Sequence, residues 1–526
     1  MRYLTALITL WLILTPDYCT AETTYFKNGM VASEHRLASA AGIEILNAGG
    51  NAVDAAVAVG YALAVVNPCC GNIGGGGFML VHLANDKNIT LNFREKAPLK
   101  ANKTMFLDKQ GNLIPNATTT GYLAVAVPGT VLGLETALKQ YGTMTRQQVM
   151  APAIRLAQYG YKVTPFEANQ FAKFADDFRK QPNVAAIFLK HGKPYQAGDV
   201  FIQTDLTHTL KLIQEKGANE FYKGSIASTI VAASHAHGGI LSLQDFADYT
   251  VTQSSPIQCL YRGYQILTVP PPSGGSTLCT MLEQLQKIPL QQEGYRSAQS
   301  ITHILEAMRY GFLKRNSIHP NVNVVQPHHE LTDTTHYSIV DKYGNAVAVT
   351  YTINGFFGAR VIADHTGFFL NDEMDDFTTK YGTANKFGLV QSAANIVDSG
   401  KRPFSSMSPT IILKNHQPWL VIGSPGGPRI ITTILLTLVN LIDYKMPLQA
   451  AVDAPRFHYQ GLPNTIDAEP QAFTPGIQQI LFQEGYHITP QTTWGAIEAI
   501  QLDEKNHSLI GANDYRRPDG AALKTR

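Results

Sequence analysis

The order of apolar and polar positions predicts two neighbouring helices near the start of the chain. Residues 35–48 and 51–66 both have helical patterns, and the glycine pair between them is a helix stop. The second stretch, NAVDAAVAVGYALAVV, is apolar on nearly every side, so it is expected to be buried. The glycine-rich turn GNIGGGG then leads into a strand, and a further strand from Ile89 carries Arg94 at its end. Residues 120–245 carry mostly helical patterns with connecting loops.

The pattern changes at residues 333–354, DTTHYSIVDKYGNAVAVTYTIN. Alternating apolar positions on both sides of the turn KYGN predict a two-stranded hairpin. If that turn is centred between Tyr343 and Gly344, Thr334 lies near Ile353, flanked by Thr352 and Asn354. A one-residue bulge would change the face of these side chains but not their neighbourhood.

Later segments mix strands and helices without a strict βαβ rhythm. Strands are expected at residues 367–371, 409–414 and 418–423, and a helix from Arg429 to Asp443. Residues 268–276, TVPPPSGGS, form a rigid loop before another helix. This order favours antiparallel or mixed sheets covered by helices, and we find no linker that divides the chain into independent domains.

Composition and charge exclude some classes of function. The 526 residues are 44% hydrophobic and 16% charged, and 42 basic against 40 acidic residues give a net charge of +2. Such balance argues against nucleic acid as the main partner, because phosphate binding needs concentrated basic charge. The cysteines include no CxxC or Cys/His cluster that would indicate a metal site. A disulfide between Cys259 and Cys279 and a pair of buried thiols are both compatible with the sequence.

The N-terminus has the layout of a secretory signal. Arg2 precedes an apolar run from Tyr3 to Thr15, and CTA at residues 19–21 precedes Glu22. We expect cleavage after Ala21 and an exported protein, periplasmic or secreted, with no membrane anchor in its mature form. The alternative is an uncleaved anchor, but this apolar run falls short of the roughly 20 residues that span a bilayer.

The hairpin begins with two threonines, and threonine is a poor nucleophile without a base beside its hydroxyl. Cutting the chain before a threonine supplies that base, because the new α-amino group has a pKa of about 7.7–8.0. We therefore interpret the bond between Asp333 and Thr334 as a self-cleavage site, and Thr334 as a nucleophile toward acyl groups. The alternative is an ordinary threonine-rich strand.

Two glycine-rich segments differ in their expected roles. GNIGGGG lacks the lysine of a phosphate-binding loop and leads into a strand, so close backbone packing is favoured over phosphate binding. GSPGGPRI, residues 423–430, joins a strand to a helix. The backbone N–H groups of Gly426 and Gly427 could there receive the oxyanion of an acyl-transfer intermediate, with a simple loop as the alternative.

Charged and hydroxyl side chains gather in two further segments. NDEMDDF, residues 371–377, is compatible with a solvated acidic turn, a glycosidase carboxylate pair or an anchor for a cationic substrate group. Arg94 could complement these acids by binding a carboxylate of the substrate. RPFSSMSPT, residues 402–410, offers the hydroxyls of Ser405, Ser406 and Ser408.

Taken together, these segments resemble the γ-glutamyltranspeptidase family of N-terminal-nucleophile hydrolases. The resemblance extends from about Asn28 to Asp519 and rests on seven motifs in order: NPCCGNIGGGGFML, FREKAP, PGTVLG, TTHYSIVDKYGNAVAVTYTIN, NDEMDDF, KRPFSSMSPTI and GSPGGPRIITT. It implies a four-layer αββα sandwich, made as a precursor and cut into a large subunit, residues 22–333, and a small subunit, residues 334–526. The two subunits would form one heterodimer.

The resemblance also implies a role for each candidate residue. Thr334 would be both the processing residue and the nucleophile, with Thr352 holding its hydroxyl and Gly426 and Gly427 forming the oxyanion hole. Arg94, together with Ser405 and Ser406, would bind the α-carboxylate of the γ-glutamyl group. Asp376, together with Asn354 and Glu373, would bind its α-amino group. Phe387 stands where related bacterial sequences carry an aromatic gate, here without a hydroxyl.

The activity implied is transfer of γ-glutamyl groups from glutathione and similar small molecules to water or to amino-acid and dipeptide acceptors. No cofactor and no metal are expected. One alternative is a cephalosporin-acylase-like enzyme on the same scaffold, against which the amine-binding Asp376 argues. Others are a binding protein that has lost activity and, more distantly, a glycosidase that uses the acidic cluster.

Overall fold

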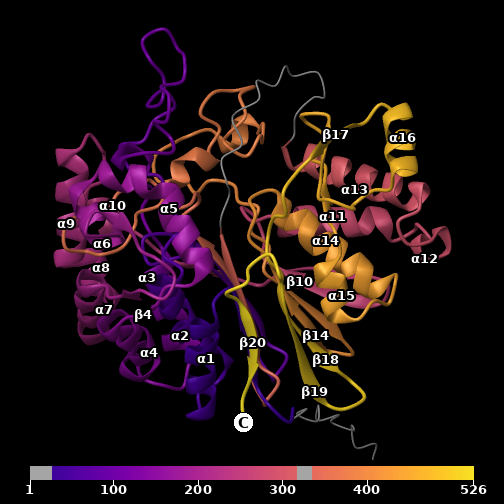
Figure 1. The fold of residues 1–526 in the computed structure, drawn as a ribbon, viewed down its shortest axis with the longest axis horizontal. Helices are drawn as coiled ribbons and strands as arrows, with labels where there is room; N and C mark the ends of the chain where they lie inside the picture. Colours follow the sequence, from indigo (N-terminus) through magenta and orange to yellow (C-terminus); the bar gives the residue numbers. More distant parts are fainter. Residues whose placement is uncertain (1–25, 317–333) are drawn as a thin grey trace, which may run out of the picture.

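A computed structural model describes residues 26–316 and 334–526. Within these residues, seven strands form one antiparallel sheet at the centre of the molecule (Figure 1). Their order across the sheet is β20 (Ala521–Lys524), β1 (Met30–Ser33), β11 (Thr335–Val340), β12 (Ala346–Thr352), β2 (Gly76–His82), β3 (Asn88–Asn92) and β8 (Thr252–Ser254). The hairpin of β11 and β12 therefore lies inside this sheet, between β1 and β2 from the N-terminal part of the chain.

A second sheet of six described strands packs against the first. Its order is β19 (Ser508–Asn513), β18 (Glu498–Asp503), β14 (Gln417–Ile422), β13 (Thr410–Lys414), β10 (Tyr264–Thr268) and β9 (Ile257–Tyr261). Cys259 of β9 forms a disulfide with Cys279, which settles the alternative that the sequence left open.

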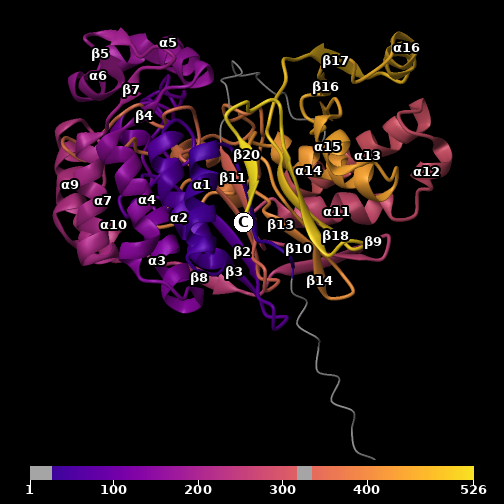
Figure 2. The ribbon, with the colours of Figure 1, turned by 60° about the horizontal axis from the view of Figure 1, so that its bottom comes forward.

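Helices cover the outer face of each sheet (Figures 1 and 2). The first helical layer comprises α1 (Arg36–Asn47), α2 (Ala52–Val66), α3 (Thr130–Tyr141), α4 (Arg146–Tyr159), α5 (Pro165–Arg179), α6 (Pro182–Phe188), α7 (Thr204–Lys216), α8 (Ala218–Lys223), α9 (Ser225–Ala236) and α10 (Leu243–Ala247). The second comprises α11 (Gly275–Leu285), α12 (Leu290–Glu293), α13 (Ala298–Asn316), α14 (Arg429–Ile442), α15 (Leu448–Asp453) and α16 (Pro475–Gln483). The expected αββα sandwich is confirmed.

Shorter elements connect these layers. They are η1 (Tyr122–Ala124), η2 (Glu373–Asp376), η3 (Ala393–Asn395), the sheet of β15 (Phe457–His458), β16 (Thr465–Ala468) and β17 (His487–Pro490), and the strand pairs β4 (Tyr161–Lys162) with β7 (Val200–Phe201) and β5 (Leu189–Lys190) with β6 (Lys193–Pro194). No helix in the described part of the chain combines the length and apolarity that a bilayer crossing requires.

Strand alternation places the two faces of the central sheet in different cores. Tyr337, Ile339, Val347 and Val349 pack against the first helical layer. Val340, Ala346 and Ala348, from the same two strands, face the second sheet. Because both faces are buried, every residue of β11 and β12 is buried, and a slip in register would move each side chain into the wrong core. The start of the hairpin is thereby fixed in place.

Most of the expected elements are present. Helix α2 is buried along its whole length, as its apolar pattern predicts, and Asn51 and Asp54 form a capping box at its start. The prediction of a strand at residues 367–371 is wrong. Gly367 has a φ of 78°, and Asn371 donates side-chain hydrogen bonds to the carbonyls of Gly74 and Ala126, so the segment is held as an irregular loop.

Candidate functional site

The hairpin brings Thr334 to Thr352. Thr335 pairs with Tyr351, one position away from the register that we expected, so Thr334 comes opposite Thr352 and not Ile353. The Thr334 hydroxyl donates to the Thr352 hydroxyl at 3.4 Å. The backbone N–H of Asn354 donates to the same Thr352 oxygen at 2.8 Å, which fixes that oxygen beside Thr334. Asp333 lies outside the described residues.

A small cavity gathers the candidate residues from segments far apart in the sequence. It is lined by all but one of the expected catalytic and substrate-binding residues: Arg94, Thr334, Thr352, Asn354, Glu373, Asp376, Ser405, Ser406 and Gly427. Gly426 lines a neighbouring, larger cavity. Thr334 is only 5% exposed, so a group that reacts with it must enter this enclosed space.

Arg94 is the central charge of the cavity and is completely buried. It follows β3 and forms ion pairs with Glu373 and Asp376, the first and last residues of η2. Its guanidinium also donates to the carbonyl of Phe404 at 3.0 Å, and Glu95 lies 3.5 Å away. The acidic segment is therefore part of the cavity wall, and the solvated-turn interpretation of its acids is wrong.

Burial sets the charge states of this cluster. Desolvation raises the pKa of Glu373 well above its ordinary range, although Arg94 lowers it. Desolvation likewise raises the pKa of Glu95 to about 7, again against the pull of Arg94. For Arg94, burial lowers the pKa, but Glu373, Asp376 and Glu95 together raise it above its ordinary value. Three carboxyl groups thus share the guanidinium of Arg94, and they could also interact with a ligand that carries an ammonium group.

The serine loop contributes to the same cavity, but its hydroxyls differ in their contacts. Ser405 Oγ accepts from the Met407 backbone N–H at 3.1 Å. The backbone N–H of Ser405 donates to the Pro272 carbonyl at 2.7 Å, which ties the loop to residues 268–276. Ser406 lines the cavity and is 8% exposed. Both serines therefore lie on the cavity wall with Arg94.

The glycine pair lies at the N-terminus of α14. Gly426 and Gly427 have φ values of 126° and 56°, in the region that favours glycine, and they immediately precede Pro428, the N-cap residue. A Cβ on Gly427 would contact the Phe387 ring at 3.3 Å. The pair therefore borders the cavity at a helix end, where backbone N–H groups are not satisfied within the helix.

The turn GNIGGGG packs against the backbone of the site, as expected. A Cβ on Gly74 would come within 2.0 Å of the Phe369 carbonyl oxygen. A Cβ on Gly75 would come within 1.8 Å of the Thr352 carbonyl oxygen. These glycines allow the turn to support the hairpin directly beneath Thr352.

Sequence reasoning missed Arg315 and Gln391, which also line the cavity. Arg315, near the end of α13, donates to the Ser405 carbonyl at 3.2 Å. Burial lowers its pKa to about 10, so it is a cation at neutral pH. Gln391 donates to the Asp376 carbonyl at 3.0 Å. Neither lies in a distinctive motif, although basic residues in the last turn of a long helix gave a weak indication for Arg315.

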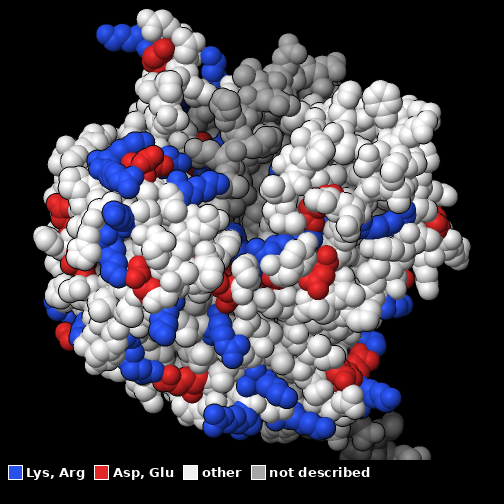
Figure 3. All heavy atoms as spheres, in the orientation of Figure 1, with Lys and Arg blue, Asp and Glu red and all other residues white. Residues whose placement is uncertain are grey.

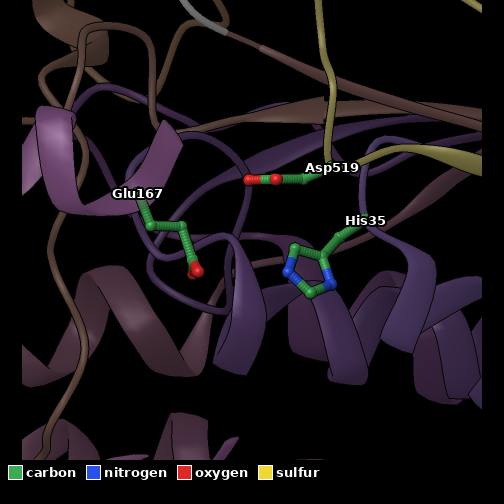
Figure 4. Close-up of side chains that lie close together, drawn as sticks. All are labelled: His35, Glu167 and Asp519. Atoms are coloured by element: carbon green, nitrogen blue, oxygen red, sulfur yellow. The ribbon is translucent and has the colours of Figure 1, made fainter. Parts of the chain in front are cut away.

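The described residues contain one group with the composition of a metal site, His35, Glu167 and Asp519, whose candidate ligand atoms lie within 4.8 Å of one another. Figure 4 shows all three side chains turned toward a common centre. However, His35 Nδ1 accepts from the Leu37 backbone N–H at 3.2 Å, as the N-cap of α1. The neutral ring therefore carries its proton on Nε2, the nitrogen that would have to bind the metal.

The other two members also serve helix ends. Glu167 completes the capping box of α5 with Thr164, and Asp519 accepts from the Thr164 hydroxyl at 2.6 Å. The Asp519 carbonyl accepts from the Arg36 N–H at 2.7 Å. We therefore assign this group to the junction between α1, α5 and the C-terminal segment, and not to a metal.

Comparisons with known proteins agree with this geometry. The family model described as Gamma-glutamyltranspeptidase matches residues 38–324 and 317–524. The chain is 46% identical to a glutathione hydrolase proenzyme of Pseudomonas sp. (strain A14), over 94% of each chain. It is 41% identical to a glutathione hydrolase proenzyme of Escherichia coli (strain K12), over 94% of this chain and 91% of that one.

A solved structure reproduces the fold. The cephalosporin acylase from Bacillus halodurans aligns with a TM-score of 0.81 and 26% identity, covering 98% of this chain and 99% of that one. The scaffold is thus shared by a cephalosporin acylase and by glutathione hydrolases, so the fold alone does not decide between these activities.

Proposed function

Because this chain belongs to the gamma-glutamyltranspeptidase family, we propose that it cleaves γ-glutamyl compounds such as glutathione with Thr334 as its nucleophile. The observation that carries the assignment is the ion-paired group of Arg94, Glu373 and Asp376 beside Thr334. A γ-glutamyl group ends in an amino-acid zwitterion. When this zwitterion binds, its carboxylate pairs with Arg94 in place of the acids, and its ammonium group pairs with the acids in place of Arg94. The number of ion pairs in the cavity is therefore maintained.

The same exchange disfavours a substrate without the α-amino group. A simple acyl chain with a terminal carboxylate would separate Arg94 from its acids and replace neither ion pair on the side of the acids, which is costly in a buried site. This argument favours γ-glutamyl transfer over the acylase alternative. A glycosidase is disfavoured as well, because Glu373 and Asp376 both bind Arg94 and do not flank an open space.

The reaction follows from the arrangement around Thr334. Its hydroxyl oxygen attacks the γ-carbonyl carbon, its own α-amino group takes the hydroxyl proton, and the developing oxyanion is received by the N–H groups of Gly426 and Gly427. The carbon–nitrogen bond to the leaving amine breaks, and that amine takes the proton. Water or an acceptor amine then attacks the γ-glutamyl ester and restores the Thr334 hydroxyl.

The free α-amino group requires processing of the precursor. We propose cleavage between Asp333 and Thr334, which gives a large subunit of residues 22–333 and a small subunit of residues 334–526. β1 and β2 of the large subunit pair with β11 and β12 of the small subunit in one sheet, so the subunits would stay together as a heterodimer. We further propose that residues 1–21, which lie outside the described residues, direct export and are removed.

The first experiment compares wild type with Thr334→Ala. On a denaturing gel, wild type should give two bands and Thr334→Ala one, and only wild type should release the amine from a γ-glutamyl anilide. Ser338→Ala is a matched control, because it also removes a buried hydroxyl of the same hairpin, on β11 and outside the small cavity. An intact and fully active Thr334→Ala would refute the assignment.

The second experiment tests recognition of the amine. γ-Glutamyl anilide and glutaryl anilide differ only in the α-amino group, so wild type should prefer the first strongly. In Asp376→Asn, loss of a charge-assisted contact should lower kcat/KM for the γ-glutamyl anilide by about 10- to 100-fold, with little effect on processing. Equal turnover of both anilides by wild type would instead favour the acylase alternative.

A further inference from the structure

Cys69 and Cys70 are neighbours in the chain and form a disulfide in the turn between α2 and the glycine-rich segment. The proposed mechanism gives this pair no role. A bond between adjacent cysteines closes a small ring that includes the peptide group joining them, so it restricts backbone torsions that a reduced pair is free to change. A redox reaction at this pair therefore changes the freedom of the backbone around it.

The backbone of the cysteine pair holds the segment that follows β12. The Cys70 carbonyl accepts from the Ile353 N–H at 3.1 Å, and the Cys69 carbonyl accepts from the Phe357 N–H at 2.8 Å. These contacts lie on either side of Asn354, whose own N–H fixes the oxygen beside the nucleophile. The Cys69 carbonyl belongs to the peptide group inside the ring, so opening the disulfide frees an acceptor that supports the site.

A side chain also links the cysteine sulfur to the start of the hairpin. Cys69 Sγ lies 3.2 Å from Asn67 Oδ1, and Asn67 Nδ2 donates to Thr335 Oγ1 at 3.1 Å. A thiol can donate to that amide oxygen, whereas a disulfide sulfur has no hydrogen to donate. The turn packs closely against the same residue, because a Cβ on Gly71 would lie 2.9 Å from Cβ of Thr335. The redox state of Cys69 is therefore coupled to the residue that follows the nucleophile.

Of the two cysteines, Cys69 is the more accessible. It is 5% exposed and lines a cavity of about 20 Å³, whereas Cys70 is 1% exposed. His35 and Asp519, which lie side by side in Figure 4, line both this cavity and a wider one of about 630 Å³. A small thiol in the wider cavity has to displace these side chains to reach Cys69 Sγ. Figure 3 shows basic side chains interspersed with acidic ones across the face that it draws, so an uncharged thiol is a suitable probe.

We propose that Cys69 and Cys70 form a redox-active site that small thiols reduce, and that reduction loosens the hairpin and slows turnover at Thr334. This goes beyond the proposed function, on which only the activity readout depends. A thiolate attacks Cys69 Sγ, a mixed disulfide forms, and Cys70 leaves as a thiolate that takes a proton. A second thiolate attacks the reagent's sulfur in the mixed disulfide, so the reagent leaves as its own disulfide and Cys69 is released as a thiol. Two electrons and two protons thus pass from two thiols to the cysteine pair.

The test places processed wild type in buffers that contain dithiothreitol and its oxidised form in graded ratios. Acid quenching, labelling with N-ethylmaleimide under denaturing conditions and peptide mass spectrometry report the thiols of each cysteine pair separately. As the pair at 69 and 70 becomes reduced, turnover of a γ-glutamyl anilide should fall by about 2- to 10-fold, as expected for one weakened hydrogen bond, and reoxidation should restore it. Hydrogen exchange of the Ile353 and Phe357 amides should accelerate by a similar factor, and this readout does not depend on activity.

The double variant Cys69→Ser/Cys70→Ser is the matched control, because it removes this pair and keeps the disulfide between Cys259 and Cys279. Its turnover should resemble that of reduced wild type and should not respond to dithiothreitol. If this variant does not process, Cys259→Ser/Cys279→Ser replaces it and should keep the full wild-type response, since its remaining disulfide is the one at 69 and 70.

The inference is overturned if the pair carries thiols without any reductant, or stays oxidised until the protein unfolds. It is also overturned if reduction leaves either turnover or exchange unchanged, or if Cys69→Ser/Cys70→Ser responds to dithiothreitol as wild type does. The proposed function fails separately, if oxidised wild type releases no amine from the anilide. In that case thiol labelling and hydrogen exchange still decide whether the cysteine pair is reducible and whether it supports the hairpin.

Discussion

The close approach of Gly75 to the hairpin makes Gly75→Ala a sharp perturbation of the site. A Cβ at this position would lie 1.8 Å from the Thr352 carbonyl oxygen and 2.9 Å from Cγ2 of Ile353. Gly75 cannot easily retreat, because its carbonyl accepts from the N–H groups of Gly129 at 2.8 Å and Thr130 at 3.0 Å. The displacement therefore falls on Thr352.

The size of the effect follows from ordinary contact distances. A carbon and a carbonyl oxygen approach to about 3.3 Å, so the Thr352 carbonyl must move by about 1.5 Å. That movement takes along the Thr352 hydroxyl, which accepts from Thr334. Since a misplacement of about 1 Å can cost roughly 100-fold in rate, processing and anilide turnover should both fall by at least about 100-fold. Overpacking should also lower the free energy of unfolding by about 1–3 kcal/mol.

The assay follows the fraction of processed chain on a denaturing gel over time, the turnover of a γ-glutamyl anilide, and thermal unfolding. Gly476→Ala is the matched control. Gly476 lies in α16 with no atom within 4 Å of an added Cβ, so this variant should keep wild-type rates and should not lose stability. A folded Gly75→Ala protein that processes and turns over at the wild-type rate would show that Thr352 does not position Thr334.

Two further predictions concern the same hairpin. Thr352→Val removes the oxygen that accepts from the Thr334 hydroxyl and from the Asn354 N–H, so processing should slow at least about tenfold and the free energy of unfolding should fall by about 1–3 kcal/mol. Thr352→Ser keeps that oxygen and should retain the wild-type processing rate and stability. A Val variant that matches the Ser variant in gel and denaturant assays would count against this role. Burial lowers the pKa of His336 to about 3, so below pH 6.5 the unfolded chain binds a proton that the folded chain does not, and stability contributed by the neutral ring is lost as the pH falls. The difference in the free energy of unfolding between wild type and His336→Gln should therefore narrow by about 2 kcal/mol from pH 7 to pH 5 in urea titrations, and parallel profiles would contradict it.

The local part of the site could be predicted from the sequence because it depends on chain neighbours. The alternation in residues 333–354 predicted the hairpin and the meeting of Thr334 with Thr352. The register differed by one position, because the turn allows more than one centre and only pairing with β1 and β2 on either side fixes it. The glycine turn was also predicted, since a run of four glycines has few other structural uses.

The long-range part could not be predicted from spacing alone. Arg94 and its acidic partners are separated by 279 and 282 positions, so no periodicity relates them. Their placement here depended on family resemblance, which gave the cavity but not the ion pairs that occupy it. The strand expected at residues 367–371 failed for a related reason, because the side chain of Asn371 satisfies distant carbonyls that a strand partner would otherwise satisfy.

The two parts of the site should therefore respond differently to substitution. In the proposed mechanism the hairpin serves both the cut that exposes the Thr334 amine and the later attack on substrate, so changes at Gly75 or Thr352 should affect processing and turnover together. The side chain of Asp376 forms its ion pair with Arg94, outside the hairpin, so Asp376→Asn should separate the two readouts. It should weaken recognition of the donor amine and leave processing unchanged. An Asp376→Asn variant that loses processing and turnover in parallel would show that this side chain acts on the hairpin, and not on a ligand.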